Sequence, residues 1–239
     1  MTTGWKRQVA LSIAVTAVMA FCGTVSAFAA EAIKVGLVAA LSGPSAQSGE
    51  AITRGLQLAI DEINAKGGLL GGRMLELVQR DDESSPPKGL IAARELVSGN
   101  VVAIFGGLDS PVSLAMIPAI NKEKRIYMGV WAAATGITRN GTNPNYAFRV
   151  SAVDDLVDIR LLKFAQQKYG SKKAGLMLLN NPWGQSNEKG LIAAAKNNGA
   201  MPLSATTRTG SVFSSLGPTM NSWASPKVCA GTVTIIRAS

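Results

Sequence analysis

The chain has 239 residues, of which 47% are hydrophobic and 16% charged, and its 24 basic and 15 acidic residues give a formal net charge of +9. Gly and Pro number 25 and 10, together about 15% of the chain and below the roughly 25–30% of low-complexity sequences. This composition predicts a packed core and excludes disorder, collagen and coiled coil. The sequence contains no His and two Cys, which excludes a Ser-His-Asp triad, His-ligated or four-Cys metal sites, and a disulfide framework.

The first 29 residues have the pattern of a secretory signal peptide. Lys6 and Arg7 form a short basic head, an apolar run follows from Val9 to Cys22, and Ala27 and Ala29 offer a small-residue cleavage site. A membrane anchor is the alternative, but the run is shorter than the roughly 20 residues that a spanning helix needs. We therefore expect a periplasmic product, exported and cleaved near Ala29.

The basic balance of the mature chain does not indicate nucleic acid. Removal of the leader takes away two of the 24 basic residues and no acidic one, which leaves 22 against 15. The positive charges are scattered, with short clusters at Lys122–Arg125 and Lys172–Lys173, and no aromatic side chains are interleaved for base stacking. We expect no nucleic-acid partner.

Strands and helices are predicted to alternate through the first half of the mature chain. Strands are expected at residues 33–39, 75–78, 101–105 and 126–130, and helices between them, one of which carries an apolar stripe at helical spacing: Ile52, Leu56, Ala59, Ile60 and Ile63. Gly67-Gly68 would end this helix. Pro86-Pro87 would open the next helix, and Ser110 would cap the third, ahead of Pro111.

The same rhythm restarts after Arg149. A helix is expected at 156–168, a strand at 174–179, a polar loop at 180–186 and a helix at 187–198. Strands separated by helices imply an α/β fold with parallel sheets flanked by helices. We expect a leader at 1–29, one α/β unit at 30–149, a partial second unit at 150–205, and a tail at 206–239.

The loops after the strands carry no catalytic or nucleotide-binding motif. Residues 40–44 (ALSGP) match neither a dinucleotide-binding nor a phosphate-cradling glycine loop, and no nucleophile elbow occurs. The run Asp81-Asp82-Glu83 lacks the spaced ligands of a calcium loop and is interpreted as a solvated loop. What remains are hydroxyls and backbone amides at strand ends, at residues 42–48, 109–110 and 132–135. These groups suit a carboxylate or another small anion, so binding is favoured over catalysis.

Several segments, in this order, resemble the substrate-binding proteins of branched-chain amino acid ABC transporters, relatives of the Leu/Ile/Val-binding protein with the type I periplasmic fold. They are IKVG at 33–36, LSGP at 41–44, AIDEINAKGG at 59–68, RDD at 80–82, WAAAT at 131–135 and NPWGQSNE at 181–188. The resemblance covers about Ile33 to Leu203. It implies two lobes hinged around a cleft, which bind a small molecule without cofactor or chemistry and deliver it to a membrane permease.

The resemblance also implies a set of ligand-binding residues. By position, Ser110, Ala133 and Thr135 match the first-lobe residues that hold the ligand's carboxylate and ammonium groups. Trp183 matches the aromatic wall from the second lobe. Ser48 stands where well-known members place an aromatic side chain over the ligand. This difference leaves polar or aromatic amino acids and other small carboxylates open as ligands beside the branched-chain ones.

The last 34 residues depart from the family pattern. Residues 206–239 match no expected segment and show no sustained amphipathic period. Family chains are roughly 150 residues longer, and the part that follows includes the acidic residue that usually pairs with the ligand ammonium. We hypothesise a frameshift or truncation near codon 204, with a divergent natural end as the alternative.

The leading hypothesis is a monomeric, non-enzymatic amino-acid-binding component of an ABC importer. The alternatives are a ligand-sensing periplasmic receptor domain, a non-functional fragment of the binding protein, and an exported enzyme, which the lack of His and of nucleophile motifs disfavours. Incomplete lobes would leave apolar faces and a strand edge uncovered, so we also expect low solubility.

Overall fold

The computed structural model describes residues 31–170, 174–197, 203–208 and 234–237. The predicted signal peptide lies outside the described residues, as does most of the predicted tail. The elements are β1 (Ile33–Ala39), α2 (Ala46–Ala65), β2 (Leu75–Asp81), α3 (Pro86–Ser98), β3 (Ala103–Gly106), α4 (Ser110–Lys122), β4 (Ile126–Gly129), the 3-10 helix η1 (Thr135–Ile137), β5 (Ala147–Arg149), α5 (Asp154–Tyr169), β6 (Ala174–Leu179), α6 (Pro182–Asn197), β7 (Leu203–Arg208) and β8 (Thr234–Arg237).

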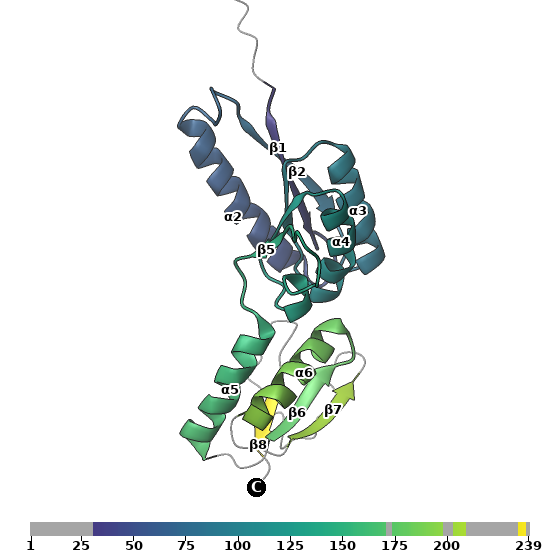
Figure 1. Cartoon of the computed structure of the whole chain (residues 1–239). Coiled ribbons are helices and arrows are strands. Elements are labelled where there is room, and N and C mark those ends of the chain that lie inside the picture. Colours follow the sequence, from purple (N-terminus) through teal and green to yellow (C-terminus); the bar gives the residue numbers. More distant parts are fainter. Residues whose placement is uncertain (1–30, 171–173, 198–202, 209–233, 238–239) are drawn as a thin grey trace, which may run out of the picture.

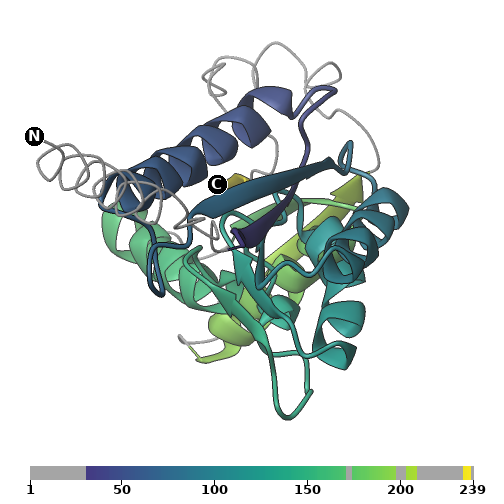
Figure 2. The same ribbon diagram turned by 90° about the horizontal axis from the view of Figure 1, so that it is seen from above.

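The first unit is a parallel sheet of five strands in the order β2-β1-β3-β4-β5. Helix α2 lies on one face of this sheet and α3 and α4 lie on the other (Figures 1 and 2). The predicted α/β fold is therefore confirmed. Because the strand order reverses at β1, the carboxyl ends of β1 and β3 form the point where open α/β sheets bind ligands.

The main core lies between this sheet and helices α3 and α4. Ile104 and Tyr127 point from the sheet to Leu96 of α3 and Met116 of α4, and all four are buried. A β-carbon at Gly36 of β1 would lie 2.8 Å from a methyl group of Leu96, so the helix approaches the strand closely. The buried residues of α3, Gly89, Ala92, Ala93 and Leu96, recur at helical spacing and form the face that packs here.

The opposite face of the sheet is covered only in part. Tyr127 and Ala147 belong to the core beneath α3 and α4, and because side chains alternate along a strand, Ile126 and Phe148 point to the face on which α2 lies. These two side chains are 46% and 50% exposed. We call the sheet surface at Ile126, Met128 and Phe148 the uncovered face. It has the apolar character expected of an incomplete lobe.

The second unit is a sheet of three strands in the order β7-β6-β8 with α5 and α6 packed against each other (Figure 1). Strand β7 runs parallel to β6 and β8 antiparallel to it. The core of this second unit is formed by six buried side chains: Leu162, Leu176, Leu178, Leu191, Ala194 and Ala195. The end of β7 and all of β8 fall in the tail predicted to depart from the family, where no strand was expected.

Several predicted bounds differ from the structure: β2 extends to Asp81 rather than to residue 78, and β3 spans Ala103–Gly106 rather than 101–105. Helix α6 begins at Pro182 rather than Asn187, because the Asn181 side chain caps it by accepting the Gly184 amide at 2.9 Å. A polar segment that was interpreted as a loop is thus a capped helix start. Strand β5 was also missed, since it has three residues and lies at the edge of the sheet. Within the described ranges, no helix combines the length and apolar character needed to cross a membrane.

Candidate functional site

The carboxyl end of β3 turns sharply into α4 and positions the first site residue. Gly106 and Gly107 have φ of +140° and +72°, and a β-carbon at Gly107 would lie 2.3 Å from the Tyr127 hydroxyl. That hydroxyl donates to the Gly106 carbonyl at 2.9 Å and lies 3.0 Å from Ser113 Oγ. Burial raises its pKa above the ordinary value, so the phenol stays a neutral donor. Only glycine fits this corner, which fixes the direction in which α4 begins.

Ser110 does not cap α4, contrary to the prediction. The N-cap position is Asp109, and Ser110 is the first residue of the helix. The Ser110 side chain is buried, and its Oγ accepts the Ala134 amide at 3.2 Å. The hydroxyl therefore joins the start of α4 to the loop after β4, which also contains the predicted residues Ala133 and Thr135.

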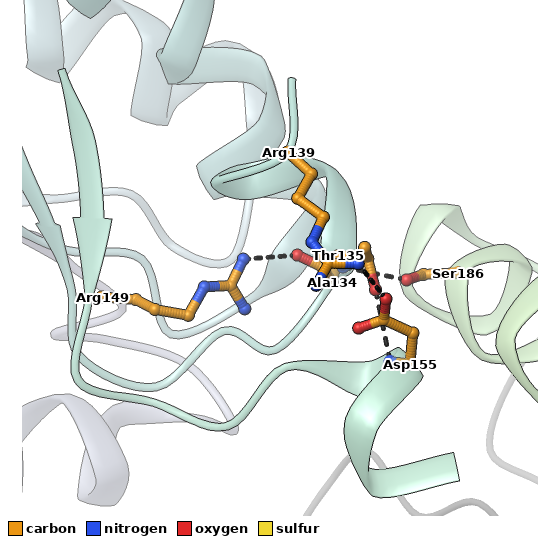
Figure 3. A network of polar contacts seen from close by, with 6 residues as sticks. All are labelled: Ala134, Thr135, Arg139, Arg149, Asp155 and Ser186. Carbon is orange, nitrogen blue, oxygen red and sulfur yellow. Dashed lines mark hydrogen bonds and ion pairs between the residues drawn. The ribbon is translucent and has the colours of Figure 1, made fainter. Parts of the chain in front are cut away.

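The loop at residues 133–135 lies between the two units (Figure 3). The Ala133 carbonyl accepts the Asp154 amide at 3.0 Å. The Thr135 amide donates to Ser186 Oγ at 3.1 Å, and Thr135 Oγ1 accepts the Asp155 amide at 3.3 Å. Three predicted ligand-binding residues, Ser110, Ala133 and Thr135, are thus brought together at the junction where the first unit meets α5 and α6.

Two arginines stabilise this junction (Figure 3). Arg149, which ends β5, donates from Nη2 to the Ala134 carbonyl at 2.6 Å and from Nη1 to the Ala152 carbonyl at 3.0 Å. Arg139 pairs with the carboxylate of Asp155. Neither arginine was among the predicted site residues, because their partners are carbonyls and a carboxylate that no short motif identifies.

Trp183 lies in the first turn of α6, not in a loop. Gly184 next to it packs so closely on the end of β6 that a β-carbon there would lie 1.8 Å from the Leu179 carbonyl oxygen. The Trp183 side chain is half-buried and lies near enough to the Asp154 carboxyl to lower its pKa. It therefore contacts the start of α5 at the same junction.

Asp154 is a buried carboxylate that the sequence analysis did not select. Burial raises its pKa above the ordinary value. Three polar side chains from the first turns of α6 counter part of this rise: Ser186, Asn187 and Trp183. The positive charge of Arg149 also lowers the pKa of Asp154. Its Oδ2 is buried without a hydrogen-bond partner. The two acidic residues opening α5 were a sequence signal that could have identified it.

Asp158 lies one turn further along α5 and is 1% exposed. Neither of its carboxyl oxygens has a hydrogen-bond partner, and a β-carbon at Gly190 of α6 would lie 2.0 Å from its Oδ2. Burial, followed by the negative charges of Asp154 and Asp155, raises its pKa to about 8. The side chain is therefore mainly a neutral acid at pH 7.

Ser48 lies apart from this junction in its contacts. It is half-buried in the first turn of α2, next to Gly49, whose amide bonds the Ser45 carbonyl. Of the hydrogen bonds that join described residues, none connects the Ser48 side chain to the other four predicted site residues.

The acidic run at 81–83 forms hydrogen bonds with the backbone, since Asp81 Oδ1 accepts the amides of Leu41 and Glu83. The described residues contain no acidic, His or Cys cluster suited to a metal ion.

A parallel sheet with its strand-end loops in contact with a second α/β unit is the architecture of a two-lobed solute-binding protein, here with an incomplete second lobe. Comparison with known proteins identifies the family. The family model for periplasmic binding proteins matches residues 32–219, and the chain belongs to this family. The match runs past Leu203, where the resemblance was expected to end.

Curated relatives include two Leu/Ile/Val-binding proteins. The chain is 31% identical to BraC3 of Rhizobium johnstonii over 69% of this chain and 43% of that protein. It is also 31% identical to homolog 2 of Brucella abortus, over 75% of this chain and 47% of the relative. The chain thus spans less than half the length of these relatives.

Solved structures share the fold. A fatty acid ABC transporter substrate-binding protein from Thermomonospora curvata is 28% identical with a TM-score of 0.64, over 75% of this chain and 44% of that one. A solute-binding protein of an ABC transporter from R. palustris, in complex with 4-hydroxybenzoate, is 26% identical with a TM-score of 0.63, over 74% and 47%. The predicted resemblance and the type I fold are confirmed.

Proposed function

We propose that this chain is the extracytoplasmic solute-binding component of an ABC importer, and that it binds an amino acid or a related small carboxylate between its lobes. Leucine, isoleucine, valine, a fatty acid and 4-hydroxybenzoate, the solutes named for its relatives, share a carboxylate in their free forms. The shared group suggests that the carboxylate is recognised by the first lobe and that the rest of the ligand varies.

The observation that carries this proposal is the gathering of Ser110, Ala133 and Thr135 at the lobe junction. Ser110 opens α4 and Thr135 opens η1, so both lie where amides without intrahelical partners favour a negative charge. The Ala133 carbonyl has a second lone pair beside the one that accepts the Asp154 amide, and it would accept a ligand donor. Trp183 and Ser48 would flank the ligand from the second lobe and from α2.

The mechanism would be binding and release without chemistry. A ligand that contacts both lobes binds the closed arrangement more tightly, and this difference shifts the population toward closure. The closed protein would then be recognised by a permease in the membrane. The proposal includes export with cleavage near Ala29, a lobe boundary near Val150, and a monomer in solution.

Isothermal titration of the full chain with L-leucine, L-isoleucine, L-valine and 4-hydroxybenzoate tests the proposal. We expect saturable binding of at least one of them, and Ser110→Ala to weaken it by about 10-fold or more, since a hydrogen bond to a charged group contributes roughly 1.5–3 kcal/mol. Ser98→Ala, at an exposed position at the end of α3, is the matched control and should bind as the unmodified chain does. Absence of heat with every solute would refute the proposal and favour a fragment that does not bind.

A further inference from the structure

The Ser186 hydroxyl belongs to the second unit but is bonded to the first. It lies in the opening turns of α6, and its Oγ accepts the Thr135 amide across 51 positions of sequence (Figure 3). The same hydroxyl lies near enough to the Asp154 carboxyl, at the start of α5, to lower the pKa of that group. A serine hydroxyl has one proton to donate and lone pairs to accept, so accepting the Thr135 amide leaves its own proton free for a second partner.

The Thr135 amide is a donor with no partner within its own helix. Thr135 is the first residue of η1, and the amides that open a helix have no intrahelical acceptor. Such an amide is satisfied by a side chain, by water or by a ligand oxygen. Here the acceptor is Ser186 Oγ, so the oxygen of a side chain occupies the position that an oxygen of a bound carboxylate would take.

We propose that Ser186 is a built-in competitor for the ligand: its hydroxyl occupies the Thr135 amide in the ligand-free protein, and a carboxylate must displace it to bind. This inference rests on the proposed function for the identity of the competing ligand. The occupation of the amide is a property of the ligand-free chain and is measurable without any ligand. A carboxylate oxygen has to bind the Thr135 amide more tightly than the serine hydroxyl does, so Ser186 lowers the affinity for the ligand.

Displacement of Ser186 leaves the junction joined by other contacts. The Asp155 amide still donates to Thr135 Oγ1, the Asp154 amide still donates to the Ala133 carbonyl, and Arg139 still pairs with Asp155. The Ser186→Ala substitution removes one oxygen from a half-buried helical position and adds no volume. We therefore expect the variant to fold and to keep its lobes in contact.

The first test is backbone amide exchange at Thr135, followed by NMR in the ligand-free full chain. A neutral hydrogen bond contributes about 0.5–1.5 kcal/mol, so Ser186→Ala should speed exchange at Thr135 by about 2- to 10-fold. The control is Ser151→Ala, which removes a hydroxyl bonded to the Ala132 carbonyl of the same loop and leaves the Thr135 amide untouched. Equal exchange at Thr135 in the unmodified chain and in Ser186→Ala would overturn the proposal.

The second test is the affinity for L-leucine of the unmodified chain and of Ser186→Ala. A competitor that is removed raises affinity, so the variant should bind about 2- to 10-fold more tightly. Weaker binding by the variant would mean that Ser186 contacts the ligand, and would overturn the proposal. If neither chain binds, the proposed function fails, and the exchange at Thr135 alone decides whether Ser186 occupies the amide.

Discussion

Replacement of Asp158 by Asn should stabilise the chain at neutral pH. The carboxyl is 1% exposed, has no hydrogen-bond partner, and has a pKa of about 8 in the folded chain against an ordinary value of 3.8. Folding therefore requires this group to keep a proton that the unfolded chain loses above pH 4. One pKa unit corresponds to about 1.4 kcal/mol, so at pH 7 the cost reaches up to about 4 kcal/mol.

The sign of the pH dependence follows from the raised pKa. Because the folded state binds the proton more tightly, this group favours folding most below about pH 4, and its contribution falls as pH rises toward 8. The Asn side chain does not titrate, so the stability of Asp158→Asn should vary less between pH 5 and 8. The difference in unfolding free energy between variant and unmodified chain should widen over this interval.

Urea unfolding followed by circular dichroism at pH 5, 6, 7 and 8 measures this difference. Asp61→Asn on α2 is the matched control, because Asp61 is exposed and bonded to the Gln57 side chain. A constant difference between Asp158→Asn and the unmodified chain at all four pH values would refute the reasoning. So would a variant that is less stable at pH 8.

Two further predictions concern backbone packing and the uncovered face. Gly184→Ala should destabilise the chain by more than about 2 kcal/mol in the same urea assay, since its β-carbon would meet the Leu179 carbonyl oxygen at 1.8 Å. The control is Gly55→Ala in α2, where the space around the glycine is open, and it should stabilise the chain by up to about 1 kcal/mol. Equal changes in unfolding free energy for the two variants would contradict this prediction. Phe148→Lys should raise the fraction of protein that stays in solution on ultracentrifugation, because it places a charge in the uncovered face. Leu156→Lys on α5, outside that face, is the control and should change this fraction less. An unchanged fraction with Phe148→Lys would be evidence against aggregation through the uncovered face.

The strands that the sequence predicted best are those with continuous apolar runs. Residues 33–39 and 174–179 form β1 and β6 with the expected bounds, because each is a mostly apolar run of strand length between polar or turn residues. Strand β5 was missed because it has only three residues, Ala147, Phe148 and Arg149, too few to show an apolar run or an alternating pattern. The start of α6 was missed because Asn181 and Pro182, a cap and a first-turn proline, were interpreted as loop residues.

The candidate site also contains residues that the sequence predicted and residues that it did not. The loops that contain Ser110, Ala133 and Thr135 were selected because carboxyl ends of parallel strands meet at one edge of a sheet, and the family resemblance indicated the individual residues. Ser186, Asp154 and Arg149 were not assigned roles, because their contacts join positions far apart in sequence. The Thr135 amide and the Ser186 hydroxyl, 51 residues apart, are an example of a pair that only the folded chain brings together.

The central claim is that a carboxylate ligand binds at the strand-end loops of the first lobe. The most direct test is to add L-leucine to the isotope-labelled full chain and to map the backbone amides whose NMR resonances shift at saturation. We predict the largest shifts at Ser110, Ala134 and Thr135, with smaller shifts in the first turn of α6. Saturable shifts confined to other surfaces, such as the uncovered face, would contradict this account of the site.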